Sequence, residues 1–154
     1  MIKQSKIFEV YKEGGKLYTI SFAPGKSVYD EKIIRQDNDE FREWNPRKSK
    51  LAALILKGCP DIKIRKNDAV LYLGASYGTT PSHVSDIVGK DGFVFALDFA
   101  PRVVRDLVFV ARERKNIAPI LEDANKPERY LDKVSKVDVL YQDIAQKNQL
   151  EVFL

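Results

Sequence analysis

The 154-residue sequence contains only one cysteine, Cys59, and one histidine, His83. A single cysteine cannot form an internal disulfide, and this pair is too small for a zinc cluster. No segment approaches the roughly 20 consecutive apolar residues that a membrane-spanning helix needs, and no secretion signal opens the chain. These absences predict a cytoplasmic protein that has no metal site and no membrane contact.

The composition is that of a globular protein, with 44% hydrophobic and 31% charged residues. The length suits one domain, or one domain with a small appendage. The net charge of +4 is unevenly spread, because residues 41–66 carry +6 while residues 1–40 balance and residues 67–154 carry −2. Such a basic segment can bind a phosphate backbone or simply be a solvated surface, and the counts alone leave both open.

The first 40 residues predict a small β module. Apolar residues alternate on both sides of Gly14-Gly15, which predicts a β-hairpin over residues 7–22, and a turn-rich extended region continues to Asp39. This module is too short to have a core of its own. We expect it to pack on the rest of the chain or to present a surface to a partner protein.

A helix is predicted to follow at Asn45-Pro46, with Asn45 as the N-cap and Pro46 in the first turn. Its buried face would consist of Leu51, Leu54 and Ile55, and Gly58 would end it. Lys50 lies on this helix, where spacing alone favours an ordinary solvated lysine.

The most informative stretch is residues 69–88. A short apolar run, 70–73, breaks at Gly74 and Gly78, and a helical pattern of Val84, Ile87 and Val88 follows. Strand, glycine turn and helix form the opening of a nucleotide-binding βαβ unit. Because the spacing is Gly-x-x-x-Gly and not the Gly-x-Gly-x-x-Gly of pyrophosphate binders, it suits a nucleoside ligand that has no phosphate to hold. A plain strand–helix turn is the alternative that the pattern alone leaves open.

Alternating strand and helix patterns then continue to the end of the chain. Strands are predicted at 93–97, 117–121 and 137–141, with helices from Pro101 and near 127–133, so the sheet should be parallel with right-handed crossovers. Each predicted strand delivers polar groups at its carboxyl end, where open α/β sheets bind ligands. These groups are Thr79 and Thr80, Asp98, Asp123, and Asp143. Asp98 stands where a ribose-binding carboxylate belongs.

Longer motifs carry a family resemblance. They are Trp44-Asn45-Pro46, residues 49–53, residues 73–86, Asp98-Phe99, residues 105–107, Glu122-Asp123-Ala124 and residues 143–146. Together they resemble the fibrillarin family, in particular the archaeal fibrillarin-like 2′-O-methyltransferases that use S-adenosylmethionine. The resemblance implies an α/β fold, the Rossmann-like parallel sheet of class I methyltransferases, incomplete here and preceded by the N-terminal β module. It divides the chain into residues 1–40 and a methyltransferase domain, residues 41–154.

The resemblance also implies the S-adenosylmethionine site. The turn residues Gly74, Ala75 and Gly78 would approach the cofactor, and Thr79 and Thr80 its methionine part. Asp98 and Phe99 would hold the ribose and adenine, although many relatives have Glu where this chain has Asp98. The adenine edge would meet Asp123 and Ala124. The methionine side would be closed by Asp143, Ile144, Ala145 and Gln146.

The family uses a Lys-Asp-Lys-His set for the transfer itself. Lys50 and Asp143 match its first two members, and His83 is interpreted as a packing residue at the start of its helix. The other two members have no counterpart after Asp143, where Lys147 is a poor substitute. Because strand 137–141 would also be left as an apolar edge, we expect the sequence to be an N-terminal fragment truncated at its C-terminus.

The partners that the resemblance implies are a guide RNA with its target rRNA or tRNA, a Nop-type scaffold protein and a kink-turn-binding ribosomal-type protein, assembled as a box C/D complex in an archaeal cytoplasm. The basic segment would face the guide–target duplex by shape and charge through Arg47, Lys48 and Lys63. Two alternatives remain open. One is a catalytically silent, cofactor-binding assembly subunit. The other is a nicotinamide-dependent dehydrogenase, which the absent Gly-x-Gly-x-x-Gly disfavours.

Overall fold

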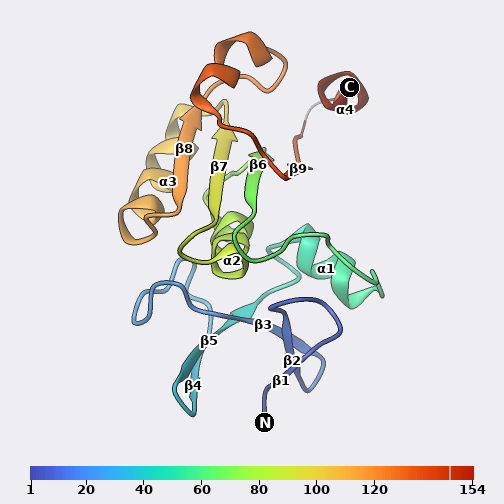
Figure 1. Cartoon of the computed structure of the whole chain (residues 1–154), viewed down its shortest axis with the longest axis vertical. Helices are drawn as coiled ribbons and strands as arrows, with labels where there is room; N and C mark the ends of the chain where they lie inside the picture. Colours follow the sequence, from blue (N-terminus) through green and yellow to red (C-terminus); the bar gives the residue numbers. More distant parts are fainter. Residues whose placement is uncertain (146) are drawn as a thin grey trace.

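The computed structural model describes residues 1–145 and 147–154, which form two sheets with helices (Figure 1). The N-terminal sheet is antiparallel, with the strand order β1-β2-β3-β5-β4. Its strands are β1 (Lys3–Gln4), β2 (Tyr11–Glu13), β3 (Lys16–Ile20), β4 (Ile33–Gln36) and β5 (Asp39–Trp44).

The predicted hairpin is present over β2 and β3, where Glu13 pairs with Lys16 across Gly14-Gly15. Both glycines have positive φ, as a tight hairpin turn requires. Residues 7–10 lie outside the strands, so the hairpin is shorter than predicted. The predicted domain boundary between residues 40 and 41 falls within β5, and the antiparallel sheet continues to Trp44.

The second sheet is parallel, with the order β8-β7-β6-β9, and confirms the predicted α/β fold. Its strands are β6 (Ala69–Leu73), β7 (Phe93–Asp98), β8 (Ile117–Leu121) and β9 (Val139–Gln142). The helices are α1 (Lys50–Leu56), α2 (Thr79–Val88), α3 (Pro101–Glu113) and α4 (Gln149–Phe153). The helix predicted near 127–133 is instead two single 3₁₀ turns, η1 (Pro127–Arg129) and η2 (Leu131–Lys133). No helix in the described ranges is long and apolar enough to cross a membrane.

Helix α2 lies between the two sheets and contacts both β3 and β7 (Figure 1). The central strands β6 and β7 are buried on both faces, which explains their unbroken apolar runs, whereas the edge strands β8 and β9 are only partly buried. In β6, Val70 and Tyr72 join the core shared with Trp44 and α2, whereas Leu71 and Leu73 face a second core. The antiparallel module thus contributes to the main core.

Helix α1 corrects the predicted start. Asn45 is not its N-cap, because the Asn45 Oδ1 accepts the Arg47 N–H in a local turn, and the helix begins only at Lys50. Ser49 is the N-cap, and its Oγ accepts the Ala52 N–H. Leu54 was also placed wrongly on the buried face, since it is 49% exposed. The buried face of α1 consists of Leu51, Ala52 and Ile55.

Candidate functional site

The carboxyl ends of three parallel strands form the site. Leu73 of β6 pairs with Leu97 of β7 and with Gln142 of β9, so the residues that follow these strands lie side by side. A cavity of about 320 Å³ opens there, a size typical of small-molecule sites. It is lined by Lys50, Gly74, Ser76, Leu97, Asp98, Phe99, Ala124, Asp143, Ile144 and Ala145.

A second cavity, of about 460 Å³, adjoins the first. We call the two the β7-side cavity and the α1-side cavity. They share four lining residues, Lys50, Gly74, Ser76 and Asp143. The α1-side cavity also contains Thr79 and Thr80 at the start of α2, together with Ala75, Arg47 and Lys48. Lys50 and Asp143 therefore lie at the junction of the two cavities.

The glycine turn after β6 is shaped by close packing within the protein. Gly74 has φ +86°, and a side chain there would overlap the Asp143 carbonyl. The N–H groups of Gly74 and Ala75 both donate to Leu97 O at 2.9 Å. Gly78 has φ +92°, and a Cβ there would lie 2.9 Å from Leu107 of α3. Gly78 thus permits helix packing and does not line either cavity.

Asp98 is held at the rim of the β7-side cavity by the backbone. Its Oδ2 accepts the Ser76 N–H at 2.9 Å and its Oδ1 accepts the Ala100 N–H at 3.1 Å. A carboxylate oxygen has a further lone pair after one such bond, so both oxygens can still accept ligand hydroxyls. Phe99 beside it is 61% exposed and offers an aromatic face.

The loop after β8 contributes Ala124, which is 5% exposed and lines the β7-side cavity. Its carbonyl accepts the hydroxyl of the buried Tyr130 at 3.1 Å. The Asp123 Oδ1 accepts from the Asn125 backbone and side chain, each at 2.9 Å. Asp123 is not part of the cavity lining, so its predicted contact with adenine stays a prediction. Gln146 lies outside the described residues.

Lys50 and Asp143 form an ion pair across 93 residues of sequence, with Lys50 Nζ 2.6 Å from Asp143 Oδ1. Lys50 is the first residue of α1, and Asp143 is anchored by its N–H to Leu73 O at 2.8 Å. The lysine side chain is 77% exposed, and exposed pairs contribute little to stability.

Burial and the Asp143 carboxylate together raise the pKa of Tyr141 to about 12.

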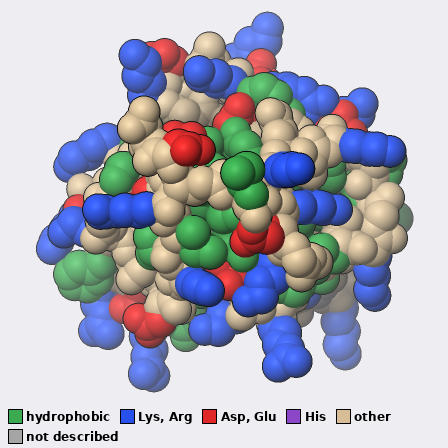
Figure 2. Space-filling view, turned by 90° about the horizontal axis from the view of Figure 1, so that it is seen from below, with side chains coloured by type: hydrophobic (Ala, Val, Ile, Leu, Met, Phe, Trp, Pro, Cys, Tyr) green, Lys and Arg blue, Asp and Glu red, His purple; other side chains and the backbone are tan. Residues whose placement is uncertain are grey.

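The basic segment 41–66 is not one surface. Arg42 is fully buried, and Lys63 lies 3.2 Å from Asp61, away from both cavities. Arg47 and Lys48 line the α1-side cavity, so only these two of the three predicted RNA-contacting residues adjoin the site. On the face of the antiparallel sheet, basic side chains are scattered among acidic and apolar ones (Figure 2).

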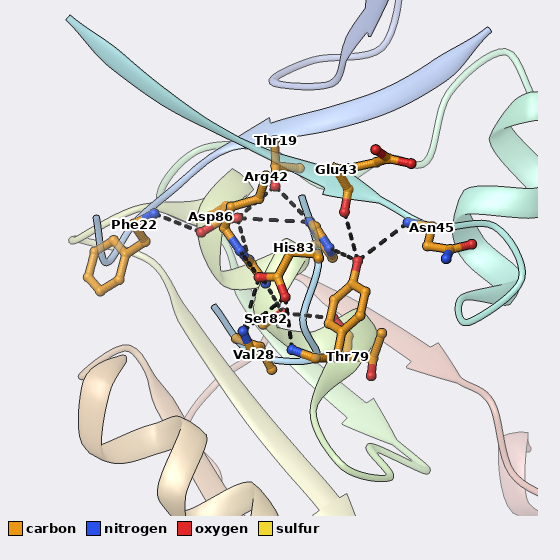
Figure 3. A network of polar contacts seen from close by, with 12 residues as sticks. Thr19, Phe22, Val28, Arg42, Glu43, Asn45, Thr79, Ser82, His83 and Asp86 are labelled. Carbon is orange, nitrogen blue, oxygen red and sulfur yellow. Dashed lines mark hydrogen bonds and ion pairs between the residues drawn. The ribbon is translucent and has the colours of Figure 1, made fainter. Parts of the chain in front are cut away.

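A buried polar network joins the antiparallel sheet to α2 (Figure 3). Arg42 of β5 pairs with Asp86 of α2 and with Glu31, each at 2.7 Å, and Arg114 also pairs with Asp86. Burial opposes the charge of Arg42, but the carboxylates of Asp86 and Glu31 outweigh it and raise its pKa. The sequence does not predict this network, because isolated charged residues in a sequence give no sign of burial.

His83 sits within this network and packs as expected. It stacks on Trp44 with ring centroids 4.9 Å apart, and its two ring nitrogens lie 2.7 Å from Thr19 Oγ1 and 2.6 Å from the Tyr29 hydroxyl. Burial, followed by the charges of Arg42 and Arg114, lowers its pKa well below 6.5. His83 is therefore a neutral structural residue, remote from the cavity lining.

Comparison with known proteins is unambiguous. The family model described as Fibrillarin matches residues 2–154. The fibrillarin-like rRNA/tRNA 2′-O-methyltransferase of Methanocaldococcus jannaschii is 52% identical over 99% of this chain and 69% of its own length. One from Methanosarcina mazei is 53% identical over 95% of this chain and 75% of its own length. Other curated relatives are covered to only 60% of their length.

Solved structures of fibrillarins also match this chain. Aeropyrum pernix fibrillarin, in complex with natively bound S-adenosyl-L-methionine, superposes with a TM-score of 0.94 at 44% identity, covering 99% of this chain and 69% of that one. A fibrillarin/Nop5p complex superposes with a TM-score of 0.86, also at 44% identity, covering 98% of this chain and 68% of that one.

Proposed function

The chain belongs to the fibrillarin family, and from that premise we propose that it is an S-adenosylmethionine-dependent RNA methyltransferase that modifies ribose 2′-hydroxyls of rRNA and tRNA. One observation supports this most strongly. The Lys50–Asp143 pair lies at the junction of two cavities, of which one is bordered by Asp98 and the other by Arg47 and Lys48. A cofactor in one cavity and a polyanionic substrate in the other would meet at that pair.

The residues of the β7-side cavity fit S-adenosylmethionine. Asp98 offers two fixed acceptors for the ribose hydroxyls, and Phe99 and Ala124 offer apolar surface for adenine. Ile144 and Ala145 would contact the methionine part from the β7-side cavity, and Thr79 and Thr80 would approach it from the adjoining α1-side cavity. Asp123 would contact the adenine edge. When bound, the cofactor supplies an electrophilic methyl carbon on a sulfonium.

The reaction joins the ribose 2′-oxygen to that methyl carbon, breaks the carbon–sulfur bond and releases the hydroxyl proton. Because the sulfonium is already reactive, placing the hydroxyl in line with it is a large part of the catalysis. We assign this placement, and a part in accepting the proton, to the Lys50–Asp143 pair, which supplies two members of the family's Lys-Asp-Lys-His set. Asp143 holds the Lys50 amine at the junction of the two cavities, where the hydroxyl of a bound ribose would meet it.

We propose that the protein acts in a box C/D complex with a guide RNA, a Nop-type scaffold protein and a kink-turn-binding protein. The fibrillarin/Nop5p structure supports the scaffold as a partner. Arg47, Lys48 and Lys63 would contact phosphates of the guide–target duplex.

Charge reversal tests the RNA contacts. The variants Arg47→Glu and Lys48→Glu should lose RNA affinity and show a shallower dependence on salt, because fewer counterions are released on binding. Lys90→Glu, exposed at the opposite end of the sheet, is the matched control. An unchanged salt dependence in the first two variants would make the segment a solvated surface only.

The decisive experiment is transfer of a labelled methyl group in the assembled complex. We expect label in a target RNA and none in the same RNA carrying a 2′-deoxynucleotide at the target position. Equal labelling of both would refute ribose methylation. Cofactor binding without transfer would favour the silent assembly subunit, and binding of NADH in its place would favour the dehydrogenase.

A further inference from the structure

Ser49 is a buried hydroxyl on which three elements converge. It is 3% exposed, and its Oγ lies 2.9 Å from Trp44 Nε1 at the end of β5. The same oxygen lies 3.3 Å from the Ala52 N–H of α1 and 2.9 Å from Thr80 Oγ1 of α2. One atom thus ties the antiparallel sheet to both helices that border the α1-side cavity.

The direction of these bonds follows from counting hydrogens. An indole N–H and a backbone N–H can only donate, so Trp44 and Ala52 occupy both lone pairs of the Ser49 oxygen. The hydrogen between the two hydroxyls is then that of Ser49, and Thr80 Oγ1 accepts it.

Two residues of the proposed reaction depend on this arrangement. Lys50 directly follows Ser49 and is the first residue of α1. The N-cap therefore fixes the position of the Lys50 backbone, from which the side chain extends to Asp143. Thr80, which lines the α1-side cavity, has its hydroxyl orientation set by Ser49. Trp44, the donor behind Ser49, is itself fixed by its stacking on His83.

We propose that Ser49 is a positioning residue for methyl transfer, which acts by placing Lys50 and orienting Thr80. This inference rests on the proposed function. It predicts that the effect of Ser49 on the rate is exerted through Lys50, whereas a residue that only supports folding would act independently of Lys50.

A double-mutant cycle separates these roles. In the assembled complex, Ser49→Ala should lower kcat at least tenfold with little change in KM for RNA, and Ser49→Thr, which keeps the hydroxyl, should restore most of it. In a Lys50→Ala background, Ser49→Ala should lower kcat no further. Ser135→Ala, at an exposed serine, is the matched control and should behave as wild type.

Each outcome has a distinct meaning. If wild type transfers no methyl group, the proposed function fails and this inference fails with it. If wild type is active but the two losses multiply, only the inference fails. If Ser49→Ala does not fold, the nearly isosteric Thr80→Val decides: it should weaken S-adenosylmethionine binding severalfold in calorimetry, and unchanged affinity would overturn the role of the hydroxyl chain.

Discussion

At the residue scale, Asp98 has its carboxylate orientation set before any ligand arrives. Two backbone N–H groups, from Ser76 and Ala100, hold its two oxygens. A preorganised acceptor loses little freedom on binding, so its contribution to affinity is kept. Ligand hydroxyls that lose this carboxylate would be left without a partner in the cavity.

We therefore expect Asp98→Ala to weaken S-adenosylmethionine binding by ~1–3 kcal/mol, the typical cost of stranding buried donors. Isothermal calorimetry measures this change. Asp91→Ala, at an exposed position beyond the other end of β7, should bind like wild type. Unchanged affinity in Asp98→Ala, with the fold intact in thermal unfolding, would reduce Asp98 to a support of the glycine turn.

Some of the residues that matter to the site and the core can be predicted from the sequence, and others cannot. Asp98, Lys50 and Asp143 could be named because strand ends and family motifs mark them, and the structure brings all three to the cavity lining. Arg42 could not, because its partner Asp86 lies 44 residues away and nothing local indicates burial. Asn45 is not the N-cap that the sequence predicts, because its side-chain oxygen accepts the N–H of Arg47, ahead of the helix.

At the element scale, the turn after β6 requires a residue without a side chain at position 74. Gly74 has φ +86° and faces the Asp143 carbonyl, so any Cβ must separate β6 from the chain that follows β9. The pattern of glycines predicts the turn and its approach to a ligand, and Gly74 lines both cavities. The clash with Asp143 involves residues 69 positions apart in sequence, and only the folded sheet reveals it.

Gly74→Ala should therefore cost more than the strain of positive φ alone. The matched control is Gly14→Ala, which has φ +54° with no atom near its Cβ and should lose about 1–2 kcal/mol in urea unfolding. Gly74→Ala should lose clearly more, and it should also weaken cofactor binding because Asp143 moves. Equal losses in the two variants would show that backbone strain explains everything at Gly74.

At the scale of the whole molecule, the buried network makes the antiparallel sheet part of the domain that carries the site. Arg42 contributes charge from one sheet, and Asp86 and Arg114 contribute it from the elements around the other. The sequence predicts that the N-terminal module packs on the main domain or presents a surface to a partner protein, but its charges give no indication of this buried network. In the sequence, Arg42 adds to the charge of the basic segment 41–66, whereas in the folded protein Glu31 and Asp86 neutralise its charge.

Breaking this joint should destabilise the protein strongly. Arg42→Met leaves the buried Asp86 and Glu31 carboxylates with one cation fewer, and removing one partner of a buried pair typically costs about 3–5 kcal/mol. Arg47→Met, the same change at an exposed arginine, should stay within about 0.5 kcal/mol of wild type. Similar urea midpoints for both variants would show that the network contributes no net stability.

The same network makes folding stability depend on pH through His83. Its pKa in the folded protein is lowered well below 6.5 by burial and by the charges of Arg42 and Arg114, while in the unfolded chain it stays near 6.5. Below that pH the unfolded state binds more protons, so stability falls as pH falls. The pKa of Glu31 is also lowered, but from 4.5, so its contribution is lost only in stronger acid.

Between about pH 7.5 and about pH 5.5, we expect the free energy of unfolding to fall by about 1.4 kcal/mol in total, with the steepest fall below pH 6.5. Urea unfolding at several pH values measures this slope, and His83 is the chain's only histidine. His83→Gln, which cannot titrate, should be less stable at neutral pH but nearly flat across the window. A slope in His83→Gln as steep as that of wild type would assign the pH dependence to other groups and leave His83 a packing residue without electrostatic consequence.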